Sequence, residues 1–340
     1  ILISSLIISY YFELDFSKQL SYGVTLAGLI QLLFLAYVTL KYYKPDLVLN
    51  LKLNSKVKFF FRKLLPSILS SGVTQINILI GTIIASFQSG AVSYLYYADR
   101  VYQINLAIAG IAVGTVSLPV LAKAFKTKNL KKISNIQNKS FELSLLLSVP
   151  ASVGLIVASE EIVNALFGYG SFSKDDVALT AEALKYFGFG VPAFALVKIL
   201  SNFYFARDNT KTPFYISMII VSLNILISVS FFSKIGFIII PIATSISTWI
   251  GVFIYLYLLN LKKTLLLKNQ LIFNFIKILV STILMSIVLL FALDSYANNL
   301  EYFYKYKALY LISIVSFVGI LYLLSCYLLG ILKLKNYKTN

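Results

Sequence analysis

The sequence predicts an all-α, polytopic membrane protein with about ten transmembrane helices. Two observations support this: apolar stretches of membrane-spanning length follow one another along the chain, and the loops between them alternate in charge. The 340 residues are 59% hydrophobic with a mean hydropathy of +0.84. A soluble domain of this size cannot bury that much apolar surface. A hydrocarbon core about 30 Å thick requires about 20 apolar residues per helix.

The ten predicted spans are separated by short polar connections. The first span opens on Ile1 inside an apolar run and is short, so we expect a fragment that lacks upstream helices. The others are long enough, or nearly long enough, to cross a bilayer. The predicted spans lie near residues 1–12, 21–43, 64–87, 91–121, 140–158, 178–206, 213–233, 236–259, 271–293 and 308–332.

The net charge of +17 is distributed as a topology signal. One set of loops and the C-terminal tail hold 21 Lys and Arg and only two acidic residues, Asp46 and Asp208. The alternating set holds five Lys and eight acidic residues. The positive-inside rule places the basic set in the cytoplasm, where it also attracts anionic lipids. We therefore expect no nucleic-acid partner. The basic set comprises residues 41–63, 122–139, 207–212, 260–270 and those after 332.

The spacing of spans and loops predicts four parts. Residues 1–43 form two helices, and residues 44–63 form a basic cytoplasmic linker between lobes. Residues 64–262 form a lobe of six helices, and residues 263–340 form two further transmembrane helices with a basic tail.

The span over 91–121 carries the most informative polar pattern. An arginine at membrane depth costs about 2.5–3.5 kcal/mol on insertion scales, so Arg100 is expected to face a wet cavity or a partner. Its guanidinium can bind a phosphate through two parallel hydrogen bonds. The alternative is that Asp99 and Arg100 mark the outer interface or pair for structure. Polar and small residues recur on one face of this helix: Ser93, Tyr97, Arg100, Gln103, Ala107, Gly110, Gly114 and Ser117.

Two other spans hold polar groups at membrane depth. In the third span, small and hydroxyl residues favour helix packing over a cavity wall. Lys198 lies nine residues before Arg207, about 13 Å along a helix, and a cavity-facing side chain is favoured there over snorkelling to the interface. The polar residues of the third span are Ser67, Ser71, Thr74, Gln75, Asn77 and Gly81.

Enzymatic catalysis has little support from the sequence. The chain has no His, and its single Cys, Cys326, lies in the last span. No P-loop, HExxH or GxSxG motif occurs. The acidic pairs Glu160–Glu161 and Asp175–Asp176 fall in the less basic loops, where SKDD before a helical run predicts an N-terminal cap. We expect a transporter with no catalytic residue, no metal site and no cofactor.

Several stretches resemble the MurJ (MviN) family of lipid II flippases, within the MOP (MATE-like) superfamily of exporters. The resemblance covers about residues 20–260, and the ADR block at 98–100 followed by GTVSLP is its most specific part. The matching stretches are LLPSILSSGVTQINILIGTIIASF, SYLYYADRVYQINLAIAGIAVGTVSLPVLAKAF, ALFGYGSFSKDD, VKILSNFYFARDNTKTP and IGFIIIPIATSISTWIGVFIYLYLL.

The resemblance implies a two-lobe fold of fourteen helices around a central cavity, with two extra helices forming a groove for a lipid tail. Residues 1–43 would then be the last two helices of the N-terminal lobe, and its first four helices would be missing. The implied function is translocation of lipid II, the undecaprenyl-pyrophosphate-linked muropeptide, across the cytoplasmic (inner) membrane of a bacterium by alternating access. Expected partners are lipid II, membrane lipids and the machinery of peptidoglycan synthesis.

The resemblance also implies where substrate binds. Arg100 matches the cavity arginine after YYAD, Lys198 matches the Lys of the family's VK pair, and Gln75 matches a polar cavity position. Asp99 and Gln103 complete the candidate substrate-binding set. A coupling ion or the membrane potential is expected to drive some relatives. The third, seventh and eighth spans offer only neutral oxygens here, so we expect no strong sodium site; these include Asn77, Asn224, Thr244 and Ser245.

Three alternatives stay open at this point. A flippase for another lipid-linked oligosaccharide, or a drug exporter, would use the same fold. A scaffold for cell-wall assembly that transports nothing is disfavoured, because it has no need of an intramembrane arginine. A membrane glycosyltransferase is disfavoured further, since no acidic metal motif lies in a cytoplasmic loop.

Overall fold

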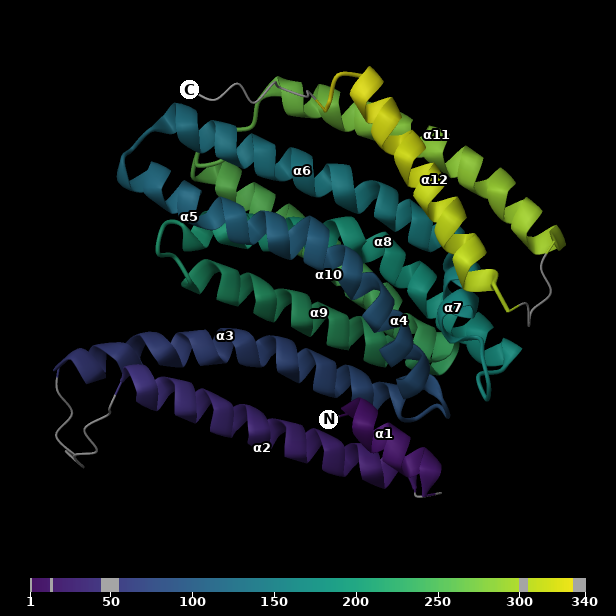
Figure 1. The fold of residues 1–340 in the computed structure, drawn as a ribbon. Helices are drawn as coiled ribbons and strands as arrows, with labels where there is room; N and C mark the ends of the chain where they lie inside the picture. The colour runs from purple at the N-terminus through teal and green to yellow at the C-terminus, as the bar shows by residue number, and fades with distance from the viewer. Residues whose placement is uncertain (1, 13–14, 44–54, 300–304, 333–340) are drawn as a thin grey trace. The chain divides into compact units, whose positions relative to one another are not determined.

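The computed structural model describes the whole chain except residues 1, 13–14, 44–54, 300–304 and 333–340 (Figure 1). In these described residues the regular structure is helical, and short turns join the helices. Most of the predicted linker at 44–63 therefore lies outside the described residues. The chain divides into two compact units, residues 1–61 and 62–340. The boundary falls within that linker, and the four-part division of the sequence stays a prediction.

The first unit contains two helices that pack against each other and the start of a third. These are α1 (Leu2–Tyr11), α2 (Phe16–Tyr42) and the first turns of α3 (Ser55–Ala85). Most apolar side chains of α2 are exposed within this unit, as suits a helix whose apolar surface meets lipid or other helices.

The first two predicted spans fall on α1 and α2. The second unit holds the remaining helices, and each of the other predicted spans falls on one of them or on a continuous run of them. The fourth span is one run of α4, a π-helical turn and α5, while a short helix, α7, was not predicted. The bounds are α4 (Ala91–Leu106), η1 (Ala107–Ala112), α5 (Val113–Lys126), α6 (Leu130–Val157), α7 (Ser159–Phe167), α8 (Lys174–Phe205), α9 (Lys211–Ile235), η2 (Gly236–Ile238), α10 (Ile239–Leu261), α11 (Asn269–Asn299) and α12 (Lys307–Leu328).

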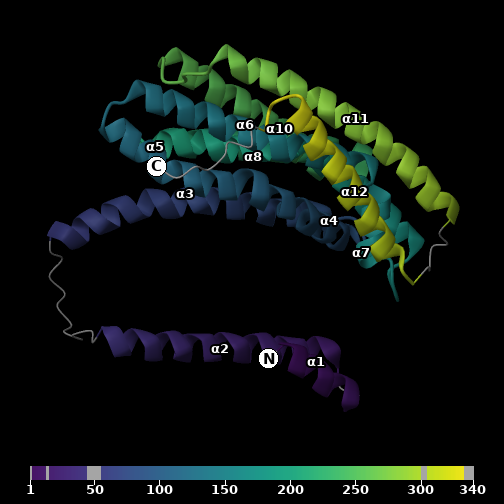
Figure 2. The ribbon, with the colours of Figure 1, turned by 45° about the horizontal axis from the view of Figure 1, so that its top comes forward.

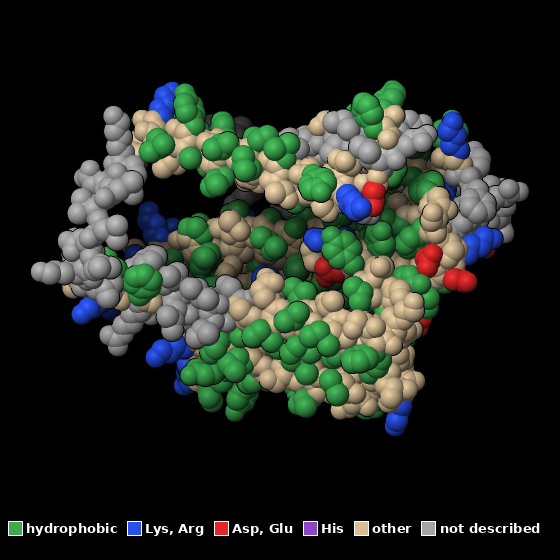
Figure 3. Space-filling model, turned by 90° about the horizontal axis from the view of Figure 1, so that it is seen from below, with side chains coloured by type: hydrophobic (Ala, Val, Ile, Leu, Met, Phe, Trp, Pro, Cys, Tyr) green, Lys and Arg blue, Asp and Glu red, His purple; other side chains and the backbone are tan. Residues whose placement is uncertain are grey.

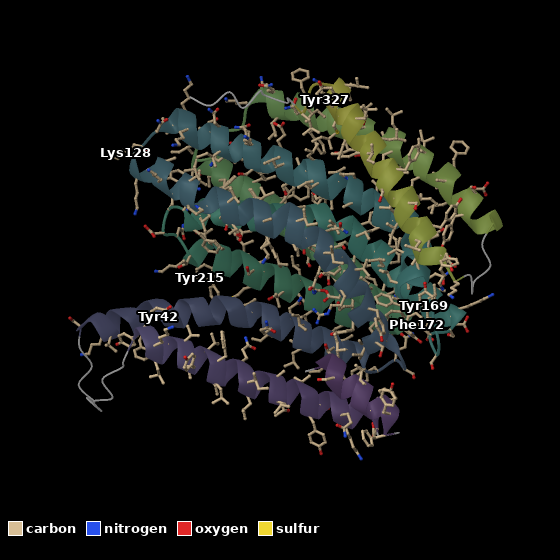
Figure 4. The ribbon with its side chains drawn as sticks, viewed as in Figure 1. Tyr42, Lys128, Tyr169, Phe172, Tyr215 and Tyr327 are labelled. Carbon is tan, nitrogen blue, oxygen red and sulfur yellow. The ribbon has the colours of Figure 1, made fainter. Side chains whose placement is uncertain are left out.

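Seven helical stretches of the described residues are long and apolar enough to cross a membrane. One of them, Lys211–Leu261, includes both α9 and α10, so the number of crossings stays a prediction. Within the second unit, the turn at Lys128 and the turn at Tyr169 and Phe172 lie at opposite ends (Figure 4). The basic and acidic loops are therefore separated by the length of the helices, as the charge pattern requires. Hydrophobic side chains cover much of the face seen in Figure 3.

Helix α8 forms the centre of the second unit and packs against α4, α6 and α10. Pro192 within α8 cannot donate a backbone hydrogen bond to Gly188. Ser152 of α6 donates its hydroxyl to that carbonyl at 2.7 Å. From α10, Ser245 donates to the Tyr186 carbonyl at 2.8 Å and Trp249 to the Phe189 carbonyl at 3.0 Å. Neighbouring helices thus supply donors around the proline, as a bilayer interior demands.

Helices α11 and α12 pack together and against α6 and α7 (Figures 1 and 2). Lys307, only 1% exposed, donates to the Asn164 side chain at 2.7 Å and to the Gly168 carbonyl at 2.6 Å. Tyr322 donates to the Leu146 carbonyl at 2.7 Å. Near the other end, the Asn138 side chain bonds the backbone of the connection between α10 and α11. These contacts fix the last two helices to the rest of the second unit.

Candidate functional site

Arg100 projects from α4 into an exposed position, four residues after Tyr96. Its guanidinium lies over the Tyr96 ring, 4.7 Å from the centroid, and its Nη2 donates to the Tyr96 hydroxyl at 3.1 Å. A cation–π contact and one hydrogen bond therefore orient the side chain while leaving most of its donors open. No carboxylate of the described residues lies within 4.0 Å of it. The alternative in which Arg100 pairs with Asp99 is not what the structure shows.

Asp99 forms no ion pair with Arg100 within 4.0 Å, although the two are neighbours in sequence. Its carboxylate accepts a hydrogen bond from the Gln103 side chain, and the Tyr102 hydroxyl interacts with the same carboxylate. Asp99, Tyr96 and Tyr102 line a cavity of about 200 Å³ that is bordered by α3, α4, α8, α9 and α10. The structure therefore brings Asp99 and Gln103 together and directs Arg100 elsewhere.

The opposite wall of this cavity carries a cluster of neutral polar groups, which we call the amide cluster: Asn77, Asn224, Ser228 and Thr244. Asn224 donates to the Asn77 side-chain oxygen at 2.9 Å and to Thr244 at 3.3 Å. Ser228 donates to the Asn224 oxygen at 3.3 Å. The sequence analysis grouped Ser245 with these oxygens, but Ser245 lines a different pocket, beside Trp249.

The small and polar face predicted for 91–121 is divided in the structure. Ser93 and Arg100 are exposed, whereas Gly110, Gly114 and Ser117 are buried. A Cβ at Gly110 would lie 3.0 Å from the Ala195 Cα, and one at Gly114 would lie 2.6 Å from the Asn202 amide nitrogen. The inner half of the face therefore permits close packing of α8. The π-helical turn between the halves has wider turns and rotates one half relative to the other.

Lys198 and Gln75 are both exposed, Lys198 on α8 and Gln75 on α3. Lys198 is notable because most neighbouring residues of α8 are buried. Among the described residues, no hydrogen bond joins either side chain to Arg100, whose partner is Tyr96. The side chains of Ser67, Ser71 and Thr74 lie outside the described residues.

The turn after α8 leads directly into α9. The Asn209 side chain accepts from the Thr212 backbone N–H at 3.1 Å and closes the turn into α9. Arg207 donates to the Phe203 carbonyl at 2.8 Å and lies over the rings of Phe125 and Tyr204. Burial lowers the pKa of the Arg207 guanidinium from its usual value. At the outer end, Ser173 and Asp176 form the predicted cap of α8 as a reciprocal capping box.

The sequence analysis missed three residues that the structure places beside the candidate set: Tyr96, Tyr102 and Ser228. Tyr96 was detectable, because it precedes Arg100 by four residues and such residues are neighbours on a helix. The positions of Tyr102 and Ser228 depend on which helices pack together. In the described part of the chain, no group of three His, Cys, Asp or Glu is placed to hold a metal ion.

Comparison with known proteins gives consistent matches. The family model described as "Lipid II flippase MurJ" matches residues 1–311. A probable lipid II flippase MurJ of Rhizobium meliloti is 39% identical over 239 residues, which are 68% of this chain and 44% of that protein. The corresponding protein of Rickettsia prowazekii is 34% identical over 323 residues, 94% of this chain and 61% of that protein. The chain therefore spans about half of the length of these relatives.

Solved structures agree with the sequence matches. A structure described as lipid II flippase MurJ in an inward closed conformation aligns with a TM-score of 0.73 at 27% identity, covering 96% of this chain and 64% of that chain. A MOP superfamily transporter from Pyrococcus furiosus aligns with a TM-score of 0.52 at 17% identity, covering 78% of this chain and 61% of that chain. The second match concerns the fold alone.

Proposed function

The chain belongs to the MurJ family of inner-membrane lipid II flippases, and from this premise we propose that the protein moves lipid II from the inner to the outer leaflet of the cytoplasmic membrane. The family relation is the first support. The observation that carries the proposal at the level of residues is Arg100, an exposed guanidinium on a transmembrane helix. Such a charge is costly in a bilayer unless it faces water or an anionic ligand.

We assign Arg100 to the pyrophosphate group of the substrate. The Tyr96 ring and hydroxyl hold one side of the guanidinium, and the remaining N–H donors can bind two phosphate oxygens in parallel. Lys198 is the second candidate contact, since it presents a cation on a helix that is otherwise mostly buried. Gln75 and Gln103 are candidates for polar contacts with the headgroup. In the proposed mechanism, alternating access exposes these groups to each leaflet in turn.

The sequence analysis included Asp99 among the candidate substrate-binding residues, but this proposal does not place it at the phosphate. A carboxylate beside a pyrophosphate would repel it, and Asp99 faces the cavity of the amide cluster instead. Asp99 is therefore left out of the proposed phosphate contacts.

The test uses the complete reading frame in cells depleted of their own lipid II flippase, and it measures lipid II in the outer leaflet. Three proteins are compared: the intact protein, Arg100→Ala, and Lys234→Ala as a matched control. Lys234 is an exposed cation near the end of α9, so its loss removes the same charge away from the proposed site. The intact protein and Lys234→Ala are expected to restore export, and Arg100→Ala is expected to fail at equal membrane levels.

Each contrary outcome has a distinct meaning. Failure of the intact, well-expressed protein contradicts lipid II as substrate and favours another lipid-linked oligosaccharide. Equal export by all three proteins keeps lipid II as substrate and removes Arg100 from the binding site.

A further inference from the structure

Asp99 is an acidic side chain within a transmembrane helix. It takes no part in the proposed binding of phosphate. It is half-buried on α4 and opens onto the cavity of about 200 Å³ that also contains the amide cluster. Arg100, the next residue, is held against Tyr96 by stacking and by a hydrogen bond at 3.1 Å. The two adjacent charges therefore occupy different surroundings.

The groups around Asp99 are almost all neutral. Its carboxylate accepts from the Gln103 side chain and interacts with the Tyr102 hydroxyl. The walls contributed by the other helices present Asn77 from α3, Phe187 from α8, Asn224 and Ser228 from α9, and Thr244 from α10. In the described part of the chain, the titratable or charged groups that line this cavity or act on Asp99 are Arg100, Tyr96 and Tyr102, all on α4.

This arrangement suits exchange of a proton. A carboxylate inside a membrane is costly when its partners are neutral, and binding a proton removes that cost. The cavity has the volume for several water molecules, at roughly 30 Å³ each, and its amide and hydroxyl groups can hydrogen-bond them. Water so held can carry a proton to and from the carboxylate.

We propose that Asp99 is a proton-binding site of this lobe, separate from the proposed phosphate contact at Arg100. In the ionised state the carboxylate accepts hydrogen bonds from Gln103 and Tyr102. A hydronium ion in the cavity water gives its proton to Asp99 Oδ2, so one O–H bond of the hydronium breaks, one O–H bond forms on the carboxyl and a water molecule remains. The protonated Oδ2 becomes a donor, and the hydrogen bond that it accepted from Gln103 is lost.

Gln103 links the protonation of Asp99 to the next part of the helix. Gln103 lies one turn before the π-helical segment Ala107–Ala112. Such segments occur often at functional sites and interrupt the regular hydrogen bonding of a helix. Release of Gln103 on protonation therefore acts next to the part of this helix that departs from regular α-helical geometry.

The experiment is infrared difference spectroscopy of the purified protein in lipid nanodiscs, titrated from about pH 8 to about pH 5, a range above the ordinary value of an aspartate carboxyl of about 3.9. The readout is the carbonyl band of a protonated carboxylic acid. The intact protein is compared with Asp99→Asn, Asp99→Glu and the control Glu160→Gln, which removes an exposed carboxyl on α7. The measurement needs no substrate, so it is independent of whether lipid II is exported.

We expect the band to grow as the pH falls, to be lost in Asp99→Asn, to shift in frequency in Asp99→Glu and to persist in the control. It should also persist in Arg100→Ala, because removal of the adjacent cation favours the neutral carboxyl over the carboxylate. The proposal is overturned if the band is the same in Asp99→Asn as in the intact protein. It is equally overturned if no protonated band forms across this range in the intact protein and in Asp99→Glu.

Discussion

Two arginines of the second unit show how the same side chain is held in opposite ways. Arg100 is exposed in a helix long enough to cross a membrane and touches one ring, that of Tyr96. Arg207 is half-buried at the end of α8, between the rings of Phe125 and Tyr204, and donates to the backbone of that helix at 2.8 Å. The first presents open donors, while the second has little room for a ligand.

The difference teaches which arginine can act on a substrate. At the end of α8, a cation is favoured by the helix dipole and by the unpaired carbonyls, so Arg207 serves the fold. Its Nη2 is buried without a hydrogen-bond partner among the described residues, and the two aromatic faces compensate in part. Arg100 has neither a helix end nor a carboxylate within 4.0 Å in the described part, so its charge is available.

The largest expected effect is the loss of export in Arg100→Ala. Losing two charge-assisted hydrogen bonds to a phosphate, at roughly 1.5 kcal/mol or more each, lowers export by about two orders of magnitude per protein molecule. The thermal midpoint should hardly change, because Arg100 is exposed. Fluorescence of the single tryptophan, Trp249, reports that midpoint in detergent. A large fall in the midpoint of Arg100→Ala would break the comparison by giving Arg100 a structural role.

For Arg207→Ala we expect a loss of stability instead of a loss of export. Loss of the bond to the Phe203 carbonyl and of two ring contacts should lower the free energy of unfolding by about 2 kcal/mol. The same fluorescence assay, with Arg207→Lys as the control for charge, measures this. Unchanged stability together with lost export would place Arg207 at a binding surface instead.

A third cation sharpens the comparison, because Lys307 is buried and, like Arg207, donates hydrogen bonds within the protein. Lys307→Met retains the apolar stem but removes the bonds to Asn164 and the Gly168 carbonyl. Leaving those buried acceptors unmatched should cost about 1–2 kcal/mol of unfolding free energy. Limited proteolysis between α11 and α12 tests whether the pair loosens; equal protection in variant and intact protein would show that Lys307 does not fix α12.

The smallest expected effect concerns the side chain that orients Arg100. Tyr96→Phe removes one hydrogen bond but keeps the stacked ring, so export should fall only about two- to fivefold. Tyr96→Leu, which removes both, should fall further. Export by Tyr96→Leu at the full rate would show that Arg100 needs no support from Tyr96.

The sequence predicted much of the fold for reasons that are local. A bilayer forces backbone hydrogen bonds into helices, so apolar length alone located the helical segments. Alternating loop charge predicted the ends at which the loops lie, and SKDD predicted the cap that Ser173 and Asp176 form at α8. The number of membrane crossings and the residues that contact substrate stay predictions.

Only the tertiary structure decided how the polar side chains are grouped. A helix period of 3.6 placed Arg100 and Gly114 on one face, but the π-helical turn and packing against α8 separated them. Asn77 and Asn224 meet although 147 residues separate them, because α3 and α9 border one cavity. The sequence determined helices because hydrogen bonds within a helix are local and the membrane enforces them. Which face each helix turns to its neighbours depends on packing between distant segments, and no local pattern contains that information.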